Sequence, residues 1–367
     1  MTAITATIAS PEADSERSLV GHLVITPART PADHAAWSQY IGSAPAATIF
    51  HDPIWAEVVE EIFGHQGRHL LAHRDDQVVG VLPLMEVRSL FGGRMLVSMP
   101  YGTYGGVLAD DAAARTALGT TAIRLVHECG ASVLDLRSTE ATLPNLETVE
   151  RYDAFIRELP EDLNGLDPFL PKRARAAARQ ARQRYGVEVE HDDEQLPAVW
   201  RLYSRSMRRL GSLNYPYQFF AKLIERLGER AWITVARHDG RIVAGTLSLV
   251  CNDTVTPYIL GLDERAGCPG ATNLLYYAVM QRAISGGLRR FDYGRTRKDN
   301  PGSAGFKKNQ GFKPRTLGYQ RYVPAGKKAR DLTPTNRRFS LARRLWPWLP
   351  LPLTRYLGGW LARSIPG

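Results

Sequence analysis

Cysteine is scarce in this chain, and long apolar runs are absent. The three cysteines, Cys129, Cys251 and Cys268, are widely spaced, and no CxxC pair or histidine-rich cluster accompanies them. The sequence therefore indicates neither a zinc site nor a disulfide framework, and it favours a reducing cytoplasm. No stretch of about 18 consecutive apolar residues occurs, so a spanning helix is not expected.

The first 20 residues lack the basic start and the apolar core of a signal peptide. They are rich in Thr, Ala, Ser and acidic residues. We interpret residues 1–20 as a disordered leader. The expected location is the cytoplasm, as the cysteine content indicates.

Acidic residues are outnumbered by basic ones. The chain has 47 Lys and Arg against 37 Asp and Glu, which gives a formal net charge of +10. This excess predicts anionic partners: nucleic acid, phosphorylated or nucleotide-linked small molecules, or anionic lipid. The hydrophobic fraction of 44% is that of an ordinary globular protein, and 367 residues allow two or three domains.

Two parts of the chain show the same order of expected elements. Each begins with a β-hairpin around an Asp-containing turn, at residues 69–87 and 231–250, and continues through a helix into a strand. The expected helices, 111–129 and 271–285, are each followed by glycine, which suits a left-handed C-cap. Coincidence among short hairpins is the alternative. The shared order favours two copies of one α+β unit of about 150 residues.

A strongly basic helix is expected between the two copies. Residues 171–185 contain six Lys or Arg and no acid, and Ala and Arg are strong helix formers. The spacing of Arg175, Arg179 and Arg182 places them on one face, where they repel one another unless an anion offsets their charge. A solvated face is the alternative. Residues 196–227 predict a further helical stretch, broken at 211–216.

Glycines, aromatics and cations are dense between the last two expected strands, 289–293 and 315–323. We expect a loop here, because glycine permits positive φ and close backbone approach. Such a loop can hold an anionic ligand, and a solvated basic loop is the alternative. Its glycines are Gly294, Gly302, Gly305 and Gly311, and its cations include Arg295, Arg297, Lys298, Lys307 and Lys308.

The C-terminal segment, residues 326–367, is basic and aromatic. Between residues 327 and 363 lie nine Lys or Arg and one acid, Asp331, interleaved with Leu, Trp and Tyr. This pattern suits a helix or hook on an anionic membrane surface. A tail docked in the protein's own groove is the alternative. Three prolines, at 347, 350 and 352, prevent one continuous helix.

The motifs of the second copy resemble those of Fem-type transferases. They are Asn273-Leu274-Leu275-Tyr276, Phe291-Asp292-Tyr293-Gly294-Arg295, Phe306-Lys307 and Gly311-Phe312, and the first copy adds Phe50-His51, Trp55 and the run 80–84. The resemblance covers roughly residues 35–323. Within the family, the chain is most similar to FemAB-like proteins associated with exosortase/PEP-CTERM systems. The resemblance implies an α+β fold of tandem GNAT-like (acyl-CoA N-acyltransferase) domains, each a mixed sheet flanked by helices. We expect these domains at 21–165 and 166–325.

The resemblance also implies an activity: transfer of an acyl or aminoacyl group to an amine of a cell-envelope or exopolysaccharide-related substrate. It implies no tightly bound cofactor, and acyl-CoA and aminoacyl-tRNA are the candidate donors. Residues 265–271 depart from the phosphate-binding turn of ordinary acetyltransferases, because their glycines are differently spaced and Pro269 removes an N–H donor. The alternative function is a non-catalytic scaffold of a membrane-associated polysaccharide or protein-sorting system. A location at the inner face of the cytoplasmic membrane would suit either function.

No Ser-His-Asp set or Cys-His pair is evident, so we expect direct attack by the amine. Lys307, which matches the family's Phe-Lys element, is expected to neutralise developing charge or to hold a donor phosphate. Phe306 would shape the site, and Arg295 would bind an anionic group. Asp292 is either a proton acceptor or a buried structural residue. The remaining candidates are Lys308 in the loop, Arg265 in the altered turn, Asn273 as a ligand contact or helix cap, Tyr104 at an acceptor cleft, and Tyr258, for which a core role is the alternative.

Overall fold

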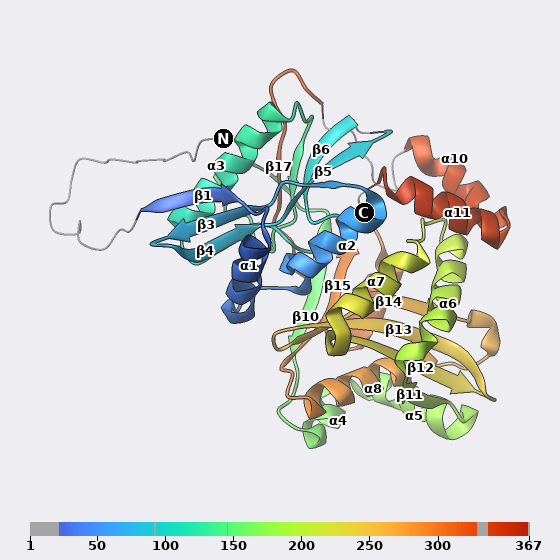
Figure 1. Cartoon of the computed structure of the whole chain (residues 1–367). Coiled ribbons are helices and arrows are strands. Elements are labelled where there is room, and N and C mark those ends of the chain that lie inside the picture. The colour runs from blue at the N-terminus through green and yellow to red at the C-terminus, as the bar shows by residue number, and fades with distance from the viewer. Residues whose placement is uncertain (1–21, 92, 145, 329–336, 366–367) are drawn as a thin grey trace. The chain divides into compact units, whose positions relative to one another are not determined.

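The computed structural model describes residues 22–91, 93–144, 146–328 and 337–365. The expected leader, residues 1–20, lies outside the described residues. The chain divides into two compact units (Figure 1). Unit 1 takes in the described residues up to Val149 and those from Gly318 to 328, and unit 2 takes in Glu150–Leu317 and 337–365.

Two strands belong to a different unit from the one that the sequence predicted. The strand β10 (Tyr152–Glu158) lies in the sheet of unit 2, although it precedes the expected border at residue 165. The strand β17 (Tyr319–Tyr322) lies in a sheet of unit 1, although we assigned it to the second copy. The expected single terminal strand, 315–323, is therefore two: β16 (Arg315–Thr316) in unit 2, and β17. Alternating hydrophobicity marks a strand but not the sheet that it joins.

Unit 1 has two sheets, in the orders β1-β3-β4-β7 and β2-β5-β6-β8-β17-β9. Helix α3 packs on β3 and β4, and its bounds confirm the first expected helix, which ends before Gly130 at φ 62°. The elements before β10 are β1 (Leu23–Pro27), α1 (Pro31–Ser43), α2 (Pro53–Phe63), β2 (Gln66–Gly67), β3 (Leu70–Arg74), β4 (Gln77–Leu82), β5 (Leu84–Ser89), β6 (Gly93–Ser98), β7 (Leu108–Ala109), α3 (Ala112–Glu128), β8 (Leu134–Leu136) and β9 (Glu147–Val149).

Unit 2 has one seven-stranded sheet, in the order β11-β12-β13-β14-β15-β10-β16. Its pairs are antiparallel except β14–β15, which is parallel, so the sheet is mixed. The remaining elements are α4 (Leu166–Phe169), α5 (Lys172–Tyr185), β11 (Glu188–His191), α6 (Leu196–Arg209), α7 (Tyr217–Leu227), β12 (Ala231–His238), β13 (Arg241–Cys251), β14 (Thr254–Leu262), α8 (Ala271–Ser285), β15 (Arg290–Arg297), α9 (Pro301–Asn309), α10 (Arg337–Leu345), η6 (Trp346–Trp348) and α11 (Leu351–Ala362).

Helices cover both faces of this sheet (Figure 1). A Cβ on Gly245 of β13 would meet Val199 of α6, whereas the neighbouring Ala244 packs in a cluster with Leu274 of α8. Successive residues of a strand point to opposite faces, so α6 and α8 lie on opposite sides of β13. Helix α5 packs against α8 through Ala178 and Ala181.

Several expected elements of unit 2 are confirmed. The hairpin β12–β13 turns through Asp239 and Gly240 at φ 48° and 71°, as a tight two-residue turn requires. The basic segment is the helix α5, the stretch 196–227 breaks between α6 and α7, and α8 has the expected bounds. The expected loop after β15 is instead largely the helix α9. Asn300 caps this helix and Pro301 occupies its first turn.

Candidate functional site

A β-bulge in β15 is the centre of the candidate site. Asp292 pairs with Ile156 of β10 and Arg295 pairs with Ala154, so two residues of β15, Tyr293 and Gly294, face one residue of β10. Gly294 adopts φ 66°, a left-handed conformation that favours glycine. Bulges of this kind interrupt the regular ladder and are common next to active sites.

The bulge brings three consecutive backbone carbonyls to one ammonium. The Nζ atom of Lys307, on α9, donates to the carbonyl oxygens of Tyr293 at 2.8 Å, Gly294 at 3.1 Å and Arg295 at 3.2 Å. Successive carbonyls of a regular strand point in alternating directions, so this convergence depends on the bulge. The ring of Phe155, the residue opposite the bulge, lies 5.1 Å from the same nitrogen.

Burial of Lys307 makes its charge costly. The residue is 8% exposed, and burial lowers the pKa of its ammonium from 10.5 to about 8, although nearby Asp292 acts in the opposite direction. Asp292 itself is buried, and its Oδ1 accepts a hydrogen bond of 2.7 Å from the backbone N–H of Gly294. That bond supports the structural alternative for Asp292, because it stabilises the bulge.

The lowered pKa predicts a pH dependence of stability. Between pH 8 and 10.5 the unfolded chain binds more protons at Lys307 than the folded chain, so the unfolding free energy should rise with pH in this range. Relative to a Lys307→Met variant, we expect a rise on the order of 2–3 kcal/mol between pH 7.5 and 10. Urea unfolding of both proteins across this range measures it. A pH-independent difference between the two proteins would contradict the assigned pKa.

An aromatic cluster lies beside the ammonium. The ring of Tyr293 is 4.9 Å from that of Tyr276, 4.7 Å from that of Phe312 and 6.2 Å from that of Phe306. Phe306 therefore lies in this cluster, and its role in shaping the site stays a prediction. The phenol oxygen of Tyr293 is buried, and no described residue forms a hydrogen bond with it. An unpartnered buried polar atom can mark a ligand contact, and we did not expect such a role for Tyr293.

The structure brings only part of the predicted site together. Lys307, Asp292 and Phe306 adjoin the bulge, whereas the guanidinium of Arg295 lies 4.4 Å from the ring of Tyr152. The role of Arg295 stays a prediction.

The other predicted residues lie elsewhere. Asn273 does not cap α8, because Gly270 is the N-cap residue and no side chain bonds there. Tyr104 is buried in unit 1 and contacts the ring of Phe50, and its role at an acceptor cleft stays a prediction. Lys308 and Arg265 are exposed, and Tyr258 is half-buried near the rings of Phe219 and Phe220.

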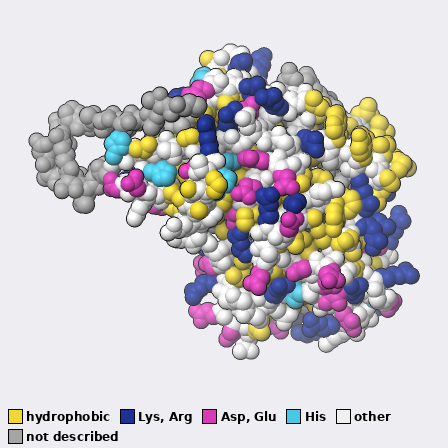
Figure 2. Space-filling model, viewed as in Figure 1, with side chains coloured by type: hydrophobic (Ala, Val, Ile, Leu, Met, Phe, Trp, Pro, Cys, Tyr) yellow, Lys and Arg dark blue, Asp and Glu magenta, His cyan; other side chains and the backbone are white. Residues whose placement is uncertain are grey.

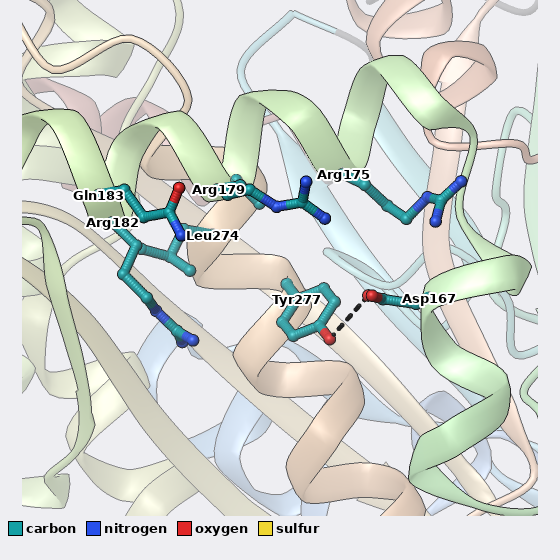
Figure 3. Close-up of a pocket in the computed structure, with 8 residues that line it drawn as sticks. Asp167, Arg175, Arg179, Arg182, Gln183, Leu274 and Tyr277 are labelled. Carbon is teal, nitrogen blue, oxygen red and sulfur yellow. Dashed lines mark hydrogen bonds between the residues drawn. The ribbon is translucent and has the colours of Figure 1, made fainter.

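The basic face of α5 lines a groove against α8 (Figure 3). Arg175, Arg179 and Arg182 extend from α5 on the side where Tyr277 of α8 lies, as their spacing predicted. The hydroxyl of Tyr277 donates a 3.0 Å hydrogen bond to Asp167. Gln183 and Leu274 also line the groove, whose volume is about 200 Å³.

The groove has unmatched positive charge. Within the described part of the chain, none of the three arginines forms an ion pair, and the buried Nε of Arg175 has no hydrogen-bond partner. Asp167 is the one carboxylate that lines the groove. Three guanidinium groups beside one carboxylate suit an anion with several oxygens, such as a phosphate. No group of metal-ligating side chains occurs among the described residues.

The turn before α8 approaches α5 closely. Gly270 adopts φ 86°, and a Cβ there would clash with the backbone carbonyl of Ala177 on α5. The carbonyl oxygen of Ala177 therefore lies beside the first turn of α8. A helix N-terminus that receives a phosphate presents N–H groups to the ligand, and here Pro269 supplies none.

Comparisons with known proteins agree with this architecture. Residues 171–308 match the family described as acetyltransferase (GNAT) domain. The crystal structure of FemX is similar at 16% identity and a TM-score of 0.62, over 79% of this chain and 96% of that one. A tandem GNAT protein from the clavulanic acid biosynthesis pathway is similar at 14% identity and a TM-score of 0.51, over 84% of this chain and 100% of that one.

A third similar structure is the C-terminal domain of a putative lysylphosphatidylglycerol synthetase from Agrobacterium fabrum, at 13% identity and a TM-score of 0.51, over 81% of this chain and 93% of that one. No curated protein matches the sequence significantly. The chain thus has a mixed α+β fold whose structural neighbours include tandem GNAT proteins, and residues 171–308, within unit 2, match an acetyltransferase (GNAT) domain.

Proposed function

We propose that the protein is an N-acyltransferase or aminoacyltransferase that forms an amide by direct attack of an amine on an activated donor. The observation that carries this proposal is the buried Lys307 ammonium on the bulge of β15. A cation in a site of low polarity stabilises developing negative charge far more strongly than one in water. The acetyltransferase-type domain at residues 171–308 supports the same reaction class.

In the proposed step the amine nitrogen attacks the donor carbonyl, and an oxyanion develops. All three N–H bonds of Lys307 are engaged with carbonyls, and the contact with Arg295 is the longest at 3.2 Å. We propose that Lys307 exchanges this bond for one to the oxyanion. The C–N bond forms as the oxyanion develops; the C=O double bond then re-forms as the bond to the donor's sulfur or oxygen breaks, and the leaving group takes up the proton that the amine loses.

We further propose that the groove between α5 and α8 holds phosphates of the donor. Ordinary GNAT acyltransferases use acyl-CoA, but the turn at 265–271 lacks their glycine spacing and packs against Ala177. Phosphates bound by Arg175, Arg179 and Arg182 can belong to a nucleotide carrier or to tRNA. The acceptor class, an amine of a cell-envelope or exopolysaccharide-related precursor, and the link to exosortase/PEP-CTERM systems rest on the Fem-type resemblance alone.

Charge reversal in the groove tests the donor site. Hydrogen bonds to charged groups contribute about 1.5–3 kcal/mol each, so losing two of them in Arg179→Glu/Arg182→Glu should raise the donor Kd by about 10²–10⁴-fold. The control Arg173→Glu/Arg184→Glu changes the same charge on exposed positions of α5 outside the groove. Native mass spectrometry and thermal-shift titration with acyl-CoA, aminoacyl-tRNA and nucleotide-sugars measure the binding. An equal loss of donor affinity in both variants would show that the groove is not a specific donor site and that only the overall positive charge of α5 matters.

A non-catalytic scaffold is the second candidate function. The altered turn at 265–271 favours it, because an ordinary CoA pyrophosphate site is missing there. The two candidates differ in turnover. A scaffold can bind a donor without consuming it, whereas the proposed enzyme consumes it when an amine is present.

A further inference from the structure

Exposed apolar surface is concentrated in the C-terminal helices. Ten large hydrophobic side chains are exposed among the described residues, and six of them lie between residues 341 and 360. Figure 2 shows hydrophobic side chains gathered over α10 and α11. Large exposed apolar patches mark interaction sites on soluble proteins. We call these six residues the aromatic face: Leu341, Leu345, Trp348, Leu353, Tyr356 and Trp360.

The exposure does not come from a loose segment, because the opposite side of the same helices is docked on unit 2. The guanidinium of Arg355 lies 4.4 Å from the ring of Trp200 on α6, and Arg208 of α6 donates a 3.2 Å hydrogen bond to the carbonyl of Leu349. A Cβ on Gly358 would clash with Asn214, in the connection between α6 and α7. The docking alternative from the sequence is therefore correct for one side of the tail.

The two sides of α11 follow helical spacing. Thr354, Gly358 and Ala362 recur every four residues and are buried against the protein. Leu353, Tyr356 and Trp360 form the opposite stripe, and Tyr356 and Trp360 are 74% and 51% exposed. Trp348, on η6, is 85% exposed. Docking thus leaves three aromatic side chains of the segment exposed.

The charge of residues 337–365 indicates which kind of partner the aromatic face can bind. Residues 337–365 contain six arginines and no Asp or Glu, and Arg344 and Arg363 are exposed. A second copy of the chain that contacts this segment through the same segment would bring arginines close to arginines, which is unfavourable. An anionic lipid surface offers the complementary charge, and Trp and Tyr favour the interface between headgroups and acyl chains.

We propose that the aromatic face binds the surface of an anionic lipid bilayer. In this arrangement α10, η6 and α11 lie in the interface, Trp348, Tyr356 and Trp360 enter the headgroup region, and the exposed Arg344 and Arg363 meet lipid phosphates. No described helix is long and apolar enough to cross a membrane. The proposed contact is peripheral and independent of the transferase activity.

Vesicle co-sedimentation of the full chain tests this proposal. Wild-type protein should partition onto vesicles of phosphatidylcholine with phosphatidylglycerol, and bind pure phosphatidylcholine much more weakly. Trp348→Ala/Tyr356→Ala/Trp360→Ala should lower the partition coefficient about tenfold or more, since binding scales with buried apolar area. Arg344→Glu/Arg363→Glu should also lower the partition coefficient relative to wild type at low salt. This loss should be much smaller at 1 M salt, because the Debye length there is about 3 Å.

The control variant Leu90→Ala/Leu163→Ala removes two exposed leucines outside the segment and should bind as wild type does. Circular dichroism and thermal melting, compared among all variants, show that the changes leave the fold intact. Equal partitioning of the wild type and the aromatic variant would overturn the proposal. A concentration-dependent dimer in light scattering, lost in the aromatic variant and accompanied by no vesicle binding, would overturn it in favour of self-association.

Discussion

Replacing Lys307 by methionine is expected to lower kcat for acyl transfer by about 10²–10³-fold, the effect of removing one oxyanion-stabilising donor. Methionine keeps much of the side-chain volume and removes the charge. The KM for the donor should change little, because the donor's phosphates are assigned to Arg175, Arg179 and Arg182. Steady-state kinetics under donor saturation, per folded molecule, measure the effect.

Two further variants make this prediction specific. Lys308→Met removes the neighbouring exposed cation and should retain nearly full activity. In the wild type, kcat should fall as pH rises through about 8, because Lys307 loses its proton there. Lys307→Arg, which stays charged, should keep residual activity without that decline. A Lys307→Met protein with unchanged kcat would show that the lysine only holds α9 on β15.

Replacing Gly270 by alanine is expected to destabilise unit 2 by roughly 2–5 kcal/mol. The new Cβ would clash with the carbonyl of Ala177, and the φ of 86° is unfavourable for any residue with a side chain. The new Cβ is held rigidly by the backbone of residue 270, and the atoms that it meets belong to the backbone of Ala177. Neither group can rotate away, so relief of the clash requires α5 to move away from α8. The groove should then lose its shape, and donor affinity should fall with stability.

Gly267→Ala is the matched control for this change. Gly267 lies in the same turn at φ 66°, but nothing lies within 4 Å of its added Cβ. This variant should show only the cost of the backbone conformation, about 1 kcal/mol. Urea unfolding gives both values. If the two variants were equally stable, the close approach of α5 and α8 would not be a feature of the folded protein.

Local signals predicted the regular elements of unit 2 well. Glycines at 286 and 287 gave the end of α8, and the Asp239-Gly240 pair gave the turn of the β12–β13 hairpin. Helix α9 was missed because Gly302 and Gly305 suggested a loop. The Asn300-Pro301 pair is an ordinary helix-start signal that could have revealed it.

The remaining features depend on contacts distant in sequence. Which sheet β10 and β17 join is decided by their pairing partners, such as Leu136 for Gln320. No local sequence pattern specifies these partners. The bulge likewise needs β10 opposite β15. A glycine inside a strand pattern, here Gly294, is a signal for such a bulge.

Only those parts of the candidate site that are close in sequence could be predicted, because contacts between distant segments leave no local pattern. Lys307, Asp292 and Phe306 are close in sequence to the bulge or to α9, and the structure places them together. The buried hydroxyl of Tyr293 and the hydrogen bond from Tyr277 to Asp167 were not predicted. Both depend on packing between separate elements, which amino-acid spacing alone does not reveal.

The most direct test of the central claim is amine-dependent consumption of an activated donor. The full chain is incubated with acyl-CoA or aminoacyl-tRNA and a panel of amines, and the release of free CoA or deacylated tRNA is followed. We predict that one donor class is consumed only when an amine is present, and that Lys307→Met binds this donor but does not consume it. Absence of consumption with both donor classes, or full activity of Lys307→Met, would contradict a transferase site at Lys307.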